Sequence, residues 1–212
     1  MPFFNKNVYF CKKIVETQNF ASLRTKNDKI MKLMLHACCA PCSAPILESL
    51  GNQGIKPAIF YYNPNIYPKE EYEKRRDEIV RYAKKLDVPL IEGDYNHDEW
   101  LAAVQGLENE PERGGRCLIC FKMRLLATAK AAAQHGYDTI ASTLSSSRWK
   151  SLAQIDEAGN CAVASINNNV SYWAKNWRKG GLQQRRNELI QENDFYNQLY
   201  CGCEFSMARL EK

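Results

Sequence analysis

The sequence predicts a single α/β domain in which crossover helices join the strands of a parallel sheet. Two observations lead to this fold class. The 212 residues suit one domain with a sizeable core, and short apolar runs alternate along the chain with longer segments of helical periodicity. Such alternation is typical of parallel sheets, because each helix returns the chain to the start of the next strand.

Five short apolar runs are predicted to be strands. They are too short for buried helices, and turn-forming residues separate several of them from the next element. The loop after the second run, NPNIYP, contains two prolines and two asparagines, which favour turns. The predicted strands are Lys32–Ala37, Pro57–Tyr62, Val88–Ile91, Asp138–Ser142 and Val170–Ala174.

Helical segments lie between and after these strands. Pro68 suits the first position of a long helix, on which one face combines Tyr72, Arg76, Ile79, Val80, Ala83 and Leu86. Pro111–Arg116 is expected to be a loop before the next helix. The other predicted helices are Ser43–Leu50, His97–Val104, Cys117–His135, Trp149–Ala158, Leu182–Gln191 and a short one in the C-terminal tail.

Residues 1–28 are polar and rich in Asn and Lys, and we expect them to form an extension outside the domain of residues 29–212. The N-terminus lacks the apolar core of a secretory signal, and no apolar run reaches the roughly 18 residues of a membrane span. The cytoplasm is therefore the expected location. A net charge of +5 is compatible with a nucleic-acid partner, and equally with a solubilising surface charge.

Nine cysteines are the unusual feature of the composition. In a cytoplasmic chain of this size they indicate metal ligands or redox chemistry rather than a disulfide framework. Ligands of parallel sheets bind beyond the carboxyl ends of the strands, and the cysteine groups occur on such loops. Cys11 and Cys161 stand alone in the sequence, and we expect both to be structural.

The first group, HACCAPCS, places Cys38, Cys39 and Cys42 between a strand and a helix. A phosphate-binding protein would have glycines there. The N-terminus of a helix instead favours the thiolate form of cysteine, which is the form that binds metals. The second group, Cys117 and Cys120, is a C-x-x-C pair that places both sulfurs on one helix face. By itself this pair fits zinc, an iron–sulfur cluster or a redox dithiol.

The third group, Cys201 and Cys203, is separated by a single glycine. Their Cα atoms lie at most about 7 Å apart, and a disulfide is feasible if Gly202 bends the chain. The pair could instead bind a second metal. A structural zinc site uses four ligands, so the seven grouped thiols are better explained by a four-thiolate cluster and a separate pair.

These segments resemble the epoxyqueuosine reductases of the QueH type. The resemblance extends from about Lys32 to Glu211 and leaves the N-terminal extension outside it. The matching segments are HACCAPCS, FYYNPNIYPKEEYEKR, RCLICFKMRL, STLSSSRWK, NWRKGGLQQ and YCGCEFS.

The resemblance implies a Rossmann-like fold of the HUP (adenine-nucleotide-hydrolase-like) kind. It implies an oxidoreductase that converts epoxyqueuosine to queuosine at the wobble position of tRNA, the last step of queuosine biosynthesis, with electrons from a donor that the sequence does not identify. It also implies a [4Fe–4S] cluster whose ligands are Cys38, Cys39, Cys117 and Cys120.

The same resemblance implies that Cys201 and Cys203 are a redox-active pair able to form a disulfide bond, or that a second metal ion, iron, adjoins the cluster. Cys42 lies where family members vary between Cys and Asp, so it is a further candidate ligand.

Further residues are expected to contact the RNA. A target base would leave its loop and be held by stacking, for which Trp177 is a candidate. Arg148, Lys150, Arg178 and Lys179 are candidates for phosphate contacts. His36, Asp94 and Tyr200 are weak candidates for the proton donor.

Two other functions are alternatives to the reductase. One is a tRNA sulfur-transfer enzyme that uses ATP and a catalytic cysteine, although a glycine-rich phosphate loop is missing after the first strand. The other is a zinc-stabilised RNA-binding module without catalytic activity.

Overall fold

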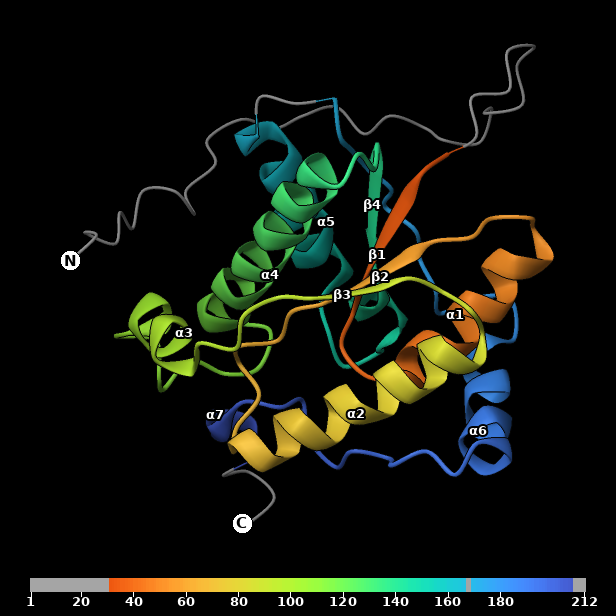
Figure 1. The fold of residues 1–212 in the computed structure, drawn as a ribbon. Helices are drawn as coiled ribbons and strands as arrows, with labels where there is room; N and C mark the ends of the chain where they lie inside the picture. Colours follow the sequence, from red (N-terminus) through yellow and green to blue (C-terminus); the bar gives the residue numbers. More distant parts are fainter. Residues whose placement is uncertain (1–30, 167–168, 208–212) are drawn as a thin grey trace.

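The computed structural model describes residues 31–166 and 169–207, which form a five-stranded parallel sheet between two layers of helices (Figure 1). The strand order is β3-β2-β1-β4-β5, so the crossover direction reverses between β1 and β4. The predicted α/β class is therefore confirmed. The strands are β1 (Leu33–Ala37), β2 (Ala58–Tyr61), β3 (Leu90–Glu92), β4 (Thr139–Ser142) and β5 (Ser171–Tyr172).

Helices cover both faces of the sheet. One face is covered by α1 (Ala40–Asn52), α2 (Lys69–Lys85) and α6 (Leu182–Glu192). The other is covered by α4 (Gly115–Gln134) and α5 (Leu152–Ser165), which pack side by side (Figure 1). Shorter helices are α3 (His97–Val104), η3 (Thr143–Ser146) and α7 (Glu204–Met207). Among the described helices, none is long and apolar enough to cross a membrane.

The position of β1 at the centre of the sheet explains why its sequence is a continuous apolar run. Leu33, Leu35 and Ala37 point into the core beneath α1 and α2, while Met34 points into the core beneath α4 and α5. A strand covered on both faces needs apolar residues at successive positions instead of alternate ones.

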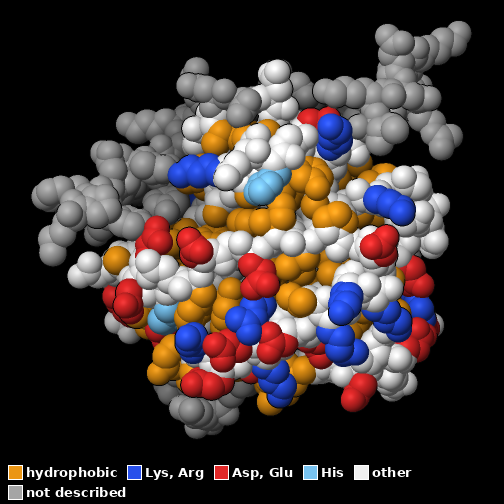
Figure 2. All heavy atoms as spheres, viewed as in Figure 1, with side chains coloured by type: hydrophobic (Ala, Val, Ile, Leu, Met, Phe, Trp, Pro, Cys, Tyr) orange, Lys and Arg blue, Asp and Glu red, His pale blue; other side chains and the backbone are white. Residues whose placement is uncertain are grey.

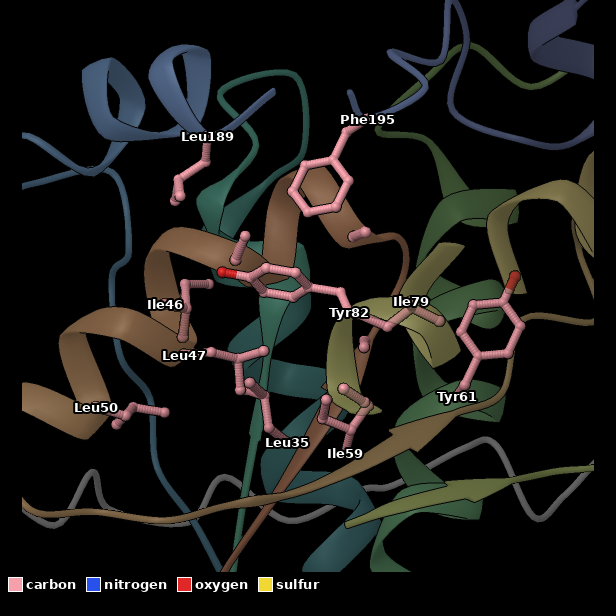
Figure 3. Close-up of a cluster of buried hydrophobic side chains, with 14 of the residues drawn as sticks. Leu35, Ile46, Leu47, Leu50, Ile59, Tyr61, Ile79, Tyr82, Leu189 and Phe195 are labelled. Carbon is pink, nitrogen blue, oxygen red and sulfur yellow. The ribbon is translucent and has the colours of Figure 1, made fainter. Parts of the chain in front are cut away.

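The core beneath α1, α2 and α6 is drawn in Figure 3. Leu47 extends from α1 toward the strand residue Leu35, and the Tyr82 ring extends from α2 toward Ile46 of α1. Burying a side chain of this size contributes about 1.5–3 kcal/mol, so this layer holds the helices firmly against the sheet.

The helix boundaries differ from the predicted ones where capping chemistry decides them. Helix α5 begins at Leu152 because Ser151 is its N-cap and accepts a hydrogen bond from the Gln154 N–H. Helix α1 begins at Ala40, earlier than predicted, with Pro41 in the first turn. The missing N–H of proline has no cost there, since the first N–H groups of a helix have no partner within it.

The buried face of α2 differs from the predicted one, because Arg75 is buried on it while Arg76 and Leu86 are not. Arg75 is 2% exposed, together with its apolar neighbours Tyr72 and Ile79, whereas Arg76 is partly exposed beside Asp77. Leu86 is 39% exposed. An arginine in an apolar stripe is unusual, and the partners of Arg75 belong to the site described below.

Two predictions lie outside the described residues. These are the extension of residues 1–28 and the structural role of Cys11.

Candidate active site

The site lies at the carboxyl ends of β1 and β4, where the crossover direction reverses. Cys38 follows β1 directly, and its backbone N–H donates to the hydroxyl of Thr143 at 3.2 Å. The same hydroxyl lies 3.4 Å from Cys38 Sγ, in position to donate to it. Thr143 follows β4, so these contacts fix the first cysteine against the neighbouring strand end.

The first cysteine group is compact. Cys39 is the N-cap of α1 and Cys42 lies in its first turn. The sulfurs of Cys38, Cys39 and Cys42 all lie within 4.8 Å of one another, and the side-chain amide of Gln198 donates to Cys39 Sγ at 3.0 Å. Sulfurs this close can serve as ligands of a single metal centre.

Burial and mutual hydrogen bonds set the protonation of this group. Hydrogen bonds from Cys39 and Cys42 hold the pKa of Cys38 well below its ordinary value, and the charges of Lys150 and Arg124 lower it further. Burial raises the pKa of Cys39 well above its ordinary value. A thiolate is therefore favoured at Cys38, while Cys39 needs a cation before it ionises.

His36, on β1, has a structural role in this arrangement. Burial and the charge of Arg124 lower its pKa to about 3, so the ring is neutral. Its Nε2 lies 3.2 Å from the Tyr62 carbonyl and its Nδ1 lies 3.0 Å from the Ser142 hydroxyl. Because a carbonyl can only accept, Nε2 carries the proton, and His36 links neighbouring strand ends instead of protonating a substrate.

The second cysteine group occupies the start of α4. Cys117 Sγ accepts from the backbone N–H of Arg113 at 3.4 Å. Cys120 is 7% exposed, and the Arg124 guanidinium one turn later lies 3.9 Å from its sulfur. Burial raises the pKa of both cysteines.

The third group, Cys201-Gly202-Cys203, is docked on the segment between β2 and α2. The Tyr67 N–H donates to the Gly202 carbonyl at 2.8 Å. Arg75 donates to the carbonyls of Cys201 and Tyr200, each at 3.2 Å. Figure 1 shows the consequence, with α7 beside the first turn of α2.

Gly202 is required at the centre of this segment. Its φ of +135° is one that side chains rarely adopt. A Cβ there would lie 3.0 Å from Ile66 and 3.2 Å from Arg75 and from Asn65. The glycine therefore lets the segment bend and approach the loop closely.

Cys201 and Cys203 differ in access. Cys201 is exposed, whereas Cys203 is 8% exposed and burial raises its pKa to about 11. Both are free thiols in the structure. Cys201 is therefore the sulfur that a substrate or reagent reaches first.

One cavity of about 660 Å³ unites the three groups. Cys39 and Cys120 are buried next to members of the groups that line it, and the volume is typical of ligand sites. The structure thus brings together thiols from the beginning, middle and end of the domain. The lining cysteines are Cys38, Cys42, Cys117, Cys201 and Cys203.

The charge of the cavity lining is strongly positive. Within the described part of the chain, the lining contains one acidic side chain, Glu112, and seven basic side chains. The face of the molecule in Figure 2 differs, since acidic and basic side chains are interspersed there. Positive charge in the cavity suits thiolates and an anionic substrate. The basic residues are Arg75, Arg113, Arg116, Arg124, Arg148, Lys150 and Arg186.

The residues predicted to contact RNA have different environments. Arg148 and Lys150 line the cavity. Lys179 is exposed but does not belong to the lining. Arg178 donates to the carbonyls of Ser147 and Lys150 and thereby supports the adjacent loop.

Trp177 requires a correction. It is 2% exposed and packs edge-on against Trp173 within the core. Its ring therefore offers no free face to a base. Among the other candidates, Asp94 is exposed outside the cavity lining, and the Tyr200 hydroxyl donates to the Tyr67 carbonyl.

Sequence reasoning missed several residues of the site. Arg124 follows Cys120 by four positions, a spacing that places both on one helix face and could have revealed it. Arg75 could have been found as a charge in the apolar stripe of α2. Gln198 and Trp149 carry no comparable signal. Cys161, predicted to be structural, is 5% exposed on α5 and is not part of the cavity lining.

Comparison with known proteins identifies the family of the chain. The family model described as "Epoxyqueuosine reductase QueH" matches residues 33–209. Proteins of that name from Acinetobacter baylyi and Haemophilus influenzae are 45% and 44% identical to the chain over 85% of its length, covering 82% and 74% of theirs. The Thermotoga maritima protein of that name is 35% identical over 85% of the chain and 93% of its own length. The chain belongs to the QueH family of epoxyqueuosine reductases.

Proposed function

We propose that this protein reduces epoxyqueuosine to queuosine in tRNA, with a [4Fe–4S] cluster on Cys38, Cys39, Cys117 and Cys120. The observation that carries the proposal is the convergence of three separate cysteine groups on one cavity. The relatives named for the same reaction support it.

The donor set fits an iron–sulfur cluster. Five cysteines line one cavity, and Cys39 and Cys120 are buried next to members of the same groups, so more sulfurs are present than one structural zinc ion uses. Burial raises the pKa of Cys39, Cys117 and Cys120, so a bound cation would be needed to hold them as thiolates. Arg124 adds positive charge beside the sulfurs of Cys120 and Cys38. We include Cys42 as a further candidate ligand, for the cluster or for a second iron ion.

The reaction needs two electrons and two protons. Both C–O bonds of the epoxide break, the oxygen leaves as water, and an alkene remains. When bound, the cluster would supply electrons one at a time. We assign the two-electron store to Cys201 and Cys203, because oxidation of their two thiols to a disulfide releases the two electrons and two protons that one epoxide consumes. The electrons of an external donor, passed one at a time through the cluster, would then return the disulfide to two thiols.

The exposed sulfur of this pair would act first. Cys201 faces the cavity and is accessible, whereas burial raises the pKa of Cys203 to about 11 and keeps it protonated. Lys150 would hold negative charge in the cavity. Burial alone would lower its pKa, but the nearby sulfurs of Cys201 and Cys38 raise it, so the amine stays charged.

The RNA would be held by positive charge around the cavity. We retain Arg148 and Lys150 as phosphate contacts because both line it, and we keep Lys179 as a more distant candidate on the exposed surface. The cytoplasm suits this chemistry, since free thiols persist in reducing compartments.

A direct conversion assay tests the proposal. Anaerobically purified protein is incubated with tRNA containing epoxyqueuosine and with dithionite, and the digested nucleosides are identified by mass spectrometry. We expect queuosine to replace epoxyqueuosine. A protein with a full complement of iron and sulfide that leaves epoxyqueuosine unchanged would refute the proposal, and a thiolated nucleoside would indicate sulfur transfer.

A further inference from the structure

Two large apolar side chains at the thiol cavity are unusually exposed. Leu199 is 77% exposed and Trp149 is 66% exposed, more than any other large hydrophobic side chain among the described residues. Both line the cavity that contains the cysteines. Large apolar groups left in solvent beside a ligand site are typical of contact surfaces.

The backbone around Trp149 is fixed although its ring is exposed. Arg113 donates to the Trp149 carbonyl at 2.9 Å and to the Arg148 carbonyl at 3.1 Å. Arg178 also donates to the Lys150 carbonyl, at 2.6 Å. A ring presented on a fixed loop loses little conformational freedom when a partner binds.

The surroundings of the ring indicate the chemistry of that partner. The Arg148 guanidinium lies 5.2 Å from the Trp149 ring centroid, and Lys150 is the next residue along. Aromatic rings interleaved with positive charges are typical of sites for single-stranded nucleic acid, in which bases stack and phosphates pair with cations. The excess of basic side chains in the cavity favours the same kind of partner.

We propose that Trp149 is a stacking platform for the base of a nucleotide adjacent to the modified one in the anticodon loop. This inference rests on the proposed function. Several of the thiols are buried, with Cys39, Cys120 and Cys203 between 1% and 8% exposed. Trp149 is at the rim, so it meets a neighbouring base while the reacting nucleotide reaches the sulfurs.

The test compares Trp149→Ala and Trp149→Phe with the wild type. The substrate is an anticodon stem-loop RNA with epoxyqueuosine at the wobble position, and dithionite supplies the electrons, so no protein donor is involved. We expect Trp149→Ala to raise KM by about 5- to 150-fold, the range typical of losing one stacked base, with iron content unchanged. Trp149→Phe should retain most of the affinity. Leu86→Ala removes an exposed apolar side chain outside the cavity lining and should leave KM unchanged.

Abasic RNAs identify the stacked partner. Stem-loops lacking the base on the 5′ or the 3′ side of the wobble nucleotide are assayed with wild type and Trp149→Ala. If Trp149 stacks on one of these bases, wild type and Trp149→Ala should have the same KM for the RNA that lacks that base. The substitution and the missing base then remove the same contact. If the effects of Trp149→Ala and of base removal on KM add fully at both neighbours, the stacking role of Trp149 is overturned.

The outcomes separate the two proposals. A wild-type KM for Trp149→Ala, or an equal loss for Trp149→Phe, would overturn the platform while leaving epoxide reduction intact. A wild-type protein that carries its iron and sulfide but does not convert the RNA would overturn the proposed function.

Discussion

Arg75 is expected to connect the stability of the protein to the position of its redox pair. Its Nε donates to Glu71 Oε1 at 2.7 Å, and the two side chains are only 3% and 11% exposed. Its other nitrogens hold the carbonyls of Tyr200 and Cys201. Arg75→Met removes all three contacts and leaves the carboxylate of Glu71 buried without its cation.

The magnitude follows from that burial. Removing one partner of a buried ion pair costs about 3–5 kcal/mol. Glu71 keeps one hydrogen bond from the Tyr196 hydroxyl at 3.0 Å, so we expect Arg75→Met to lower the free energy of unfolding by about 3 kcal/mol, the lower end of that range. Adding Glu71→Gln should recover much of the loss, because a neutral amide replaces the orphaned charge.

Two assays separate stability from positioning. Urea denaturation followed by circular dichroism should give a lower midpoint for Arg75→Met and a partial recovery for Arg75→Met/Glu71→Gln. Turnover should remain low in both variants, since neither restores the bonds to the carbonyls beside Cys201. A double variant with full turnover would refute the positioning role, and a wild-type midpoint for Arg75→Met would refute the energetic argument.

Three further predictions concern the cysteine groups. Gly202→Ala should reduce turnover while the iron content stays normal, because a Cβ at a φ of +135° would press on Ile66 and move the pair; unchanged turnover would contradict this packing. Iodoacetamide should alkylate Cys201 well before Cys203, as peptide mass spectrometry would record, because Cys203 is buried and has its pKa raised to about 11; equal rates would argue against the structure of this segment. Cys38→Ala should lose both cluster and turnover, whereas Cys201→Ala should keep the cluster and lose turnover; a fully active Cys201→Ala protein would remove its redox role.

Sequence patterns predicted the fold where the signal is local. Strand β1 is a continuous apolar run because both of its faces are buried. Helix α3 has the predicted bounds, His97–Val104, since Asn96 caps it and accepts from the Glu99 N–H. The rule for parallel sheets also predicted the position of Cys38, which follows β1 at the carboxyl edge of the sheet.

Long-range contacts could not be predicted in this way. The bond from Gln198 to Cys39 joins residues 159 positions apart, and no periodicity encodes it. Trp177 follows a strand in the sequence, as a ligand-binding residue would, yet tertiary packing buries it against Trp173. The backbone around Trp149 is likewise held by arginines from two distant loops.

In the proposed site, sulfurs from two distant stretches of the chain hold one iron–sulfur centre, and the cysteine pair of a third stretch lies at the same cavity. Iron, acid-labile sulfide and zinc are therefore to be measured per chain in anaerobically purified wild type and Cys117→Ala, with Cys161→Ala as the control outside the cavity. We predict about four iron and four sulfide per chain in the wild type and the control, and their loss in Cys117→Ala. Zinc at one per chain without sulfide, or full iron in Cys117→Ala, would contradict the account.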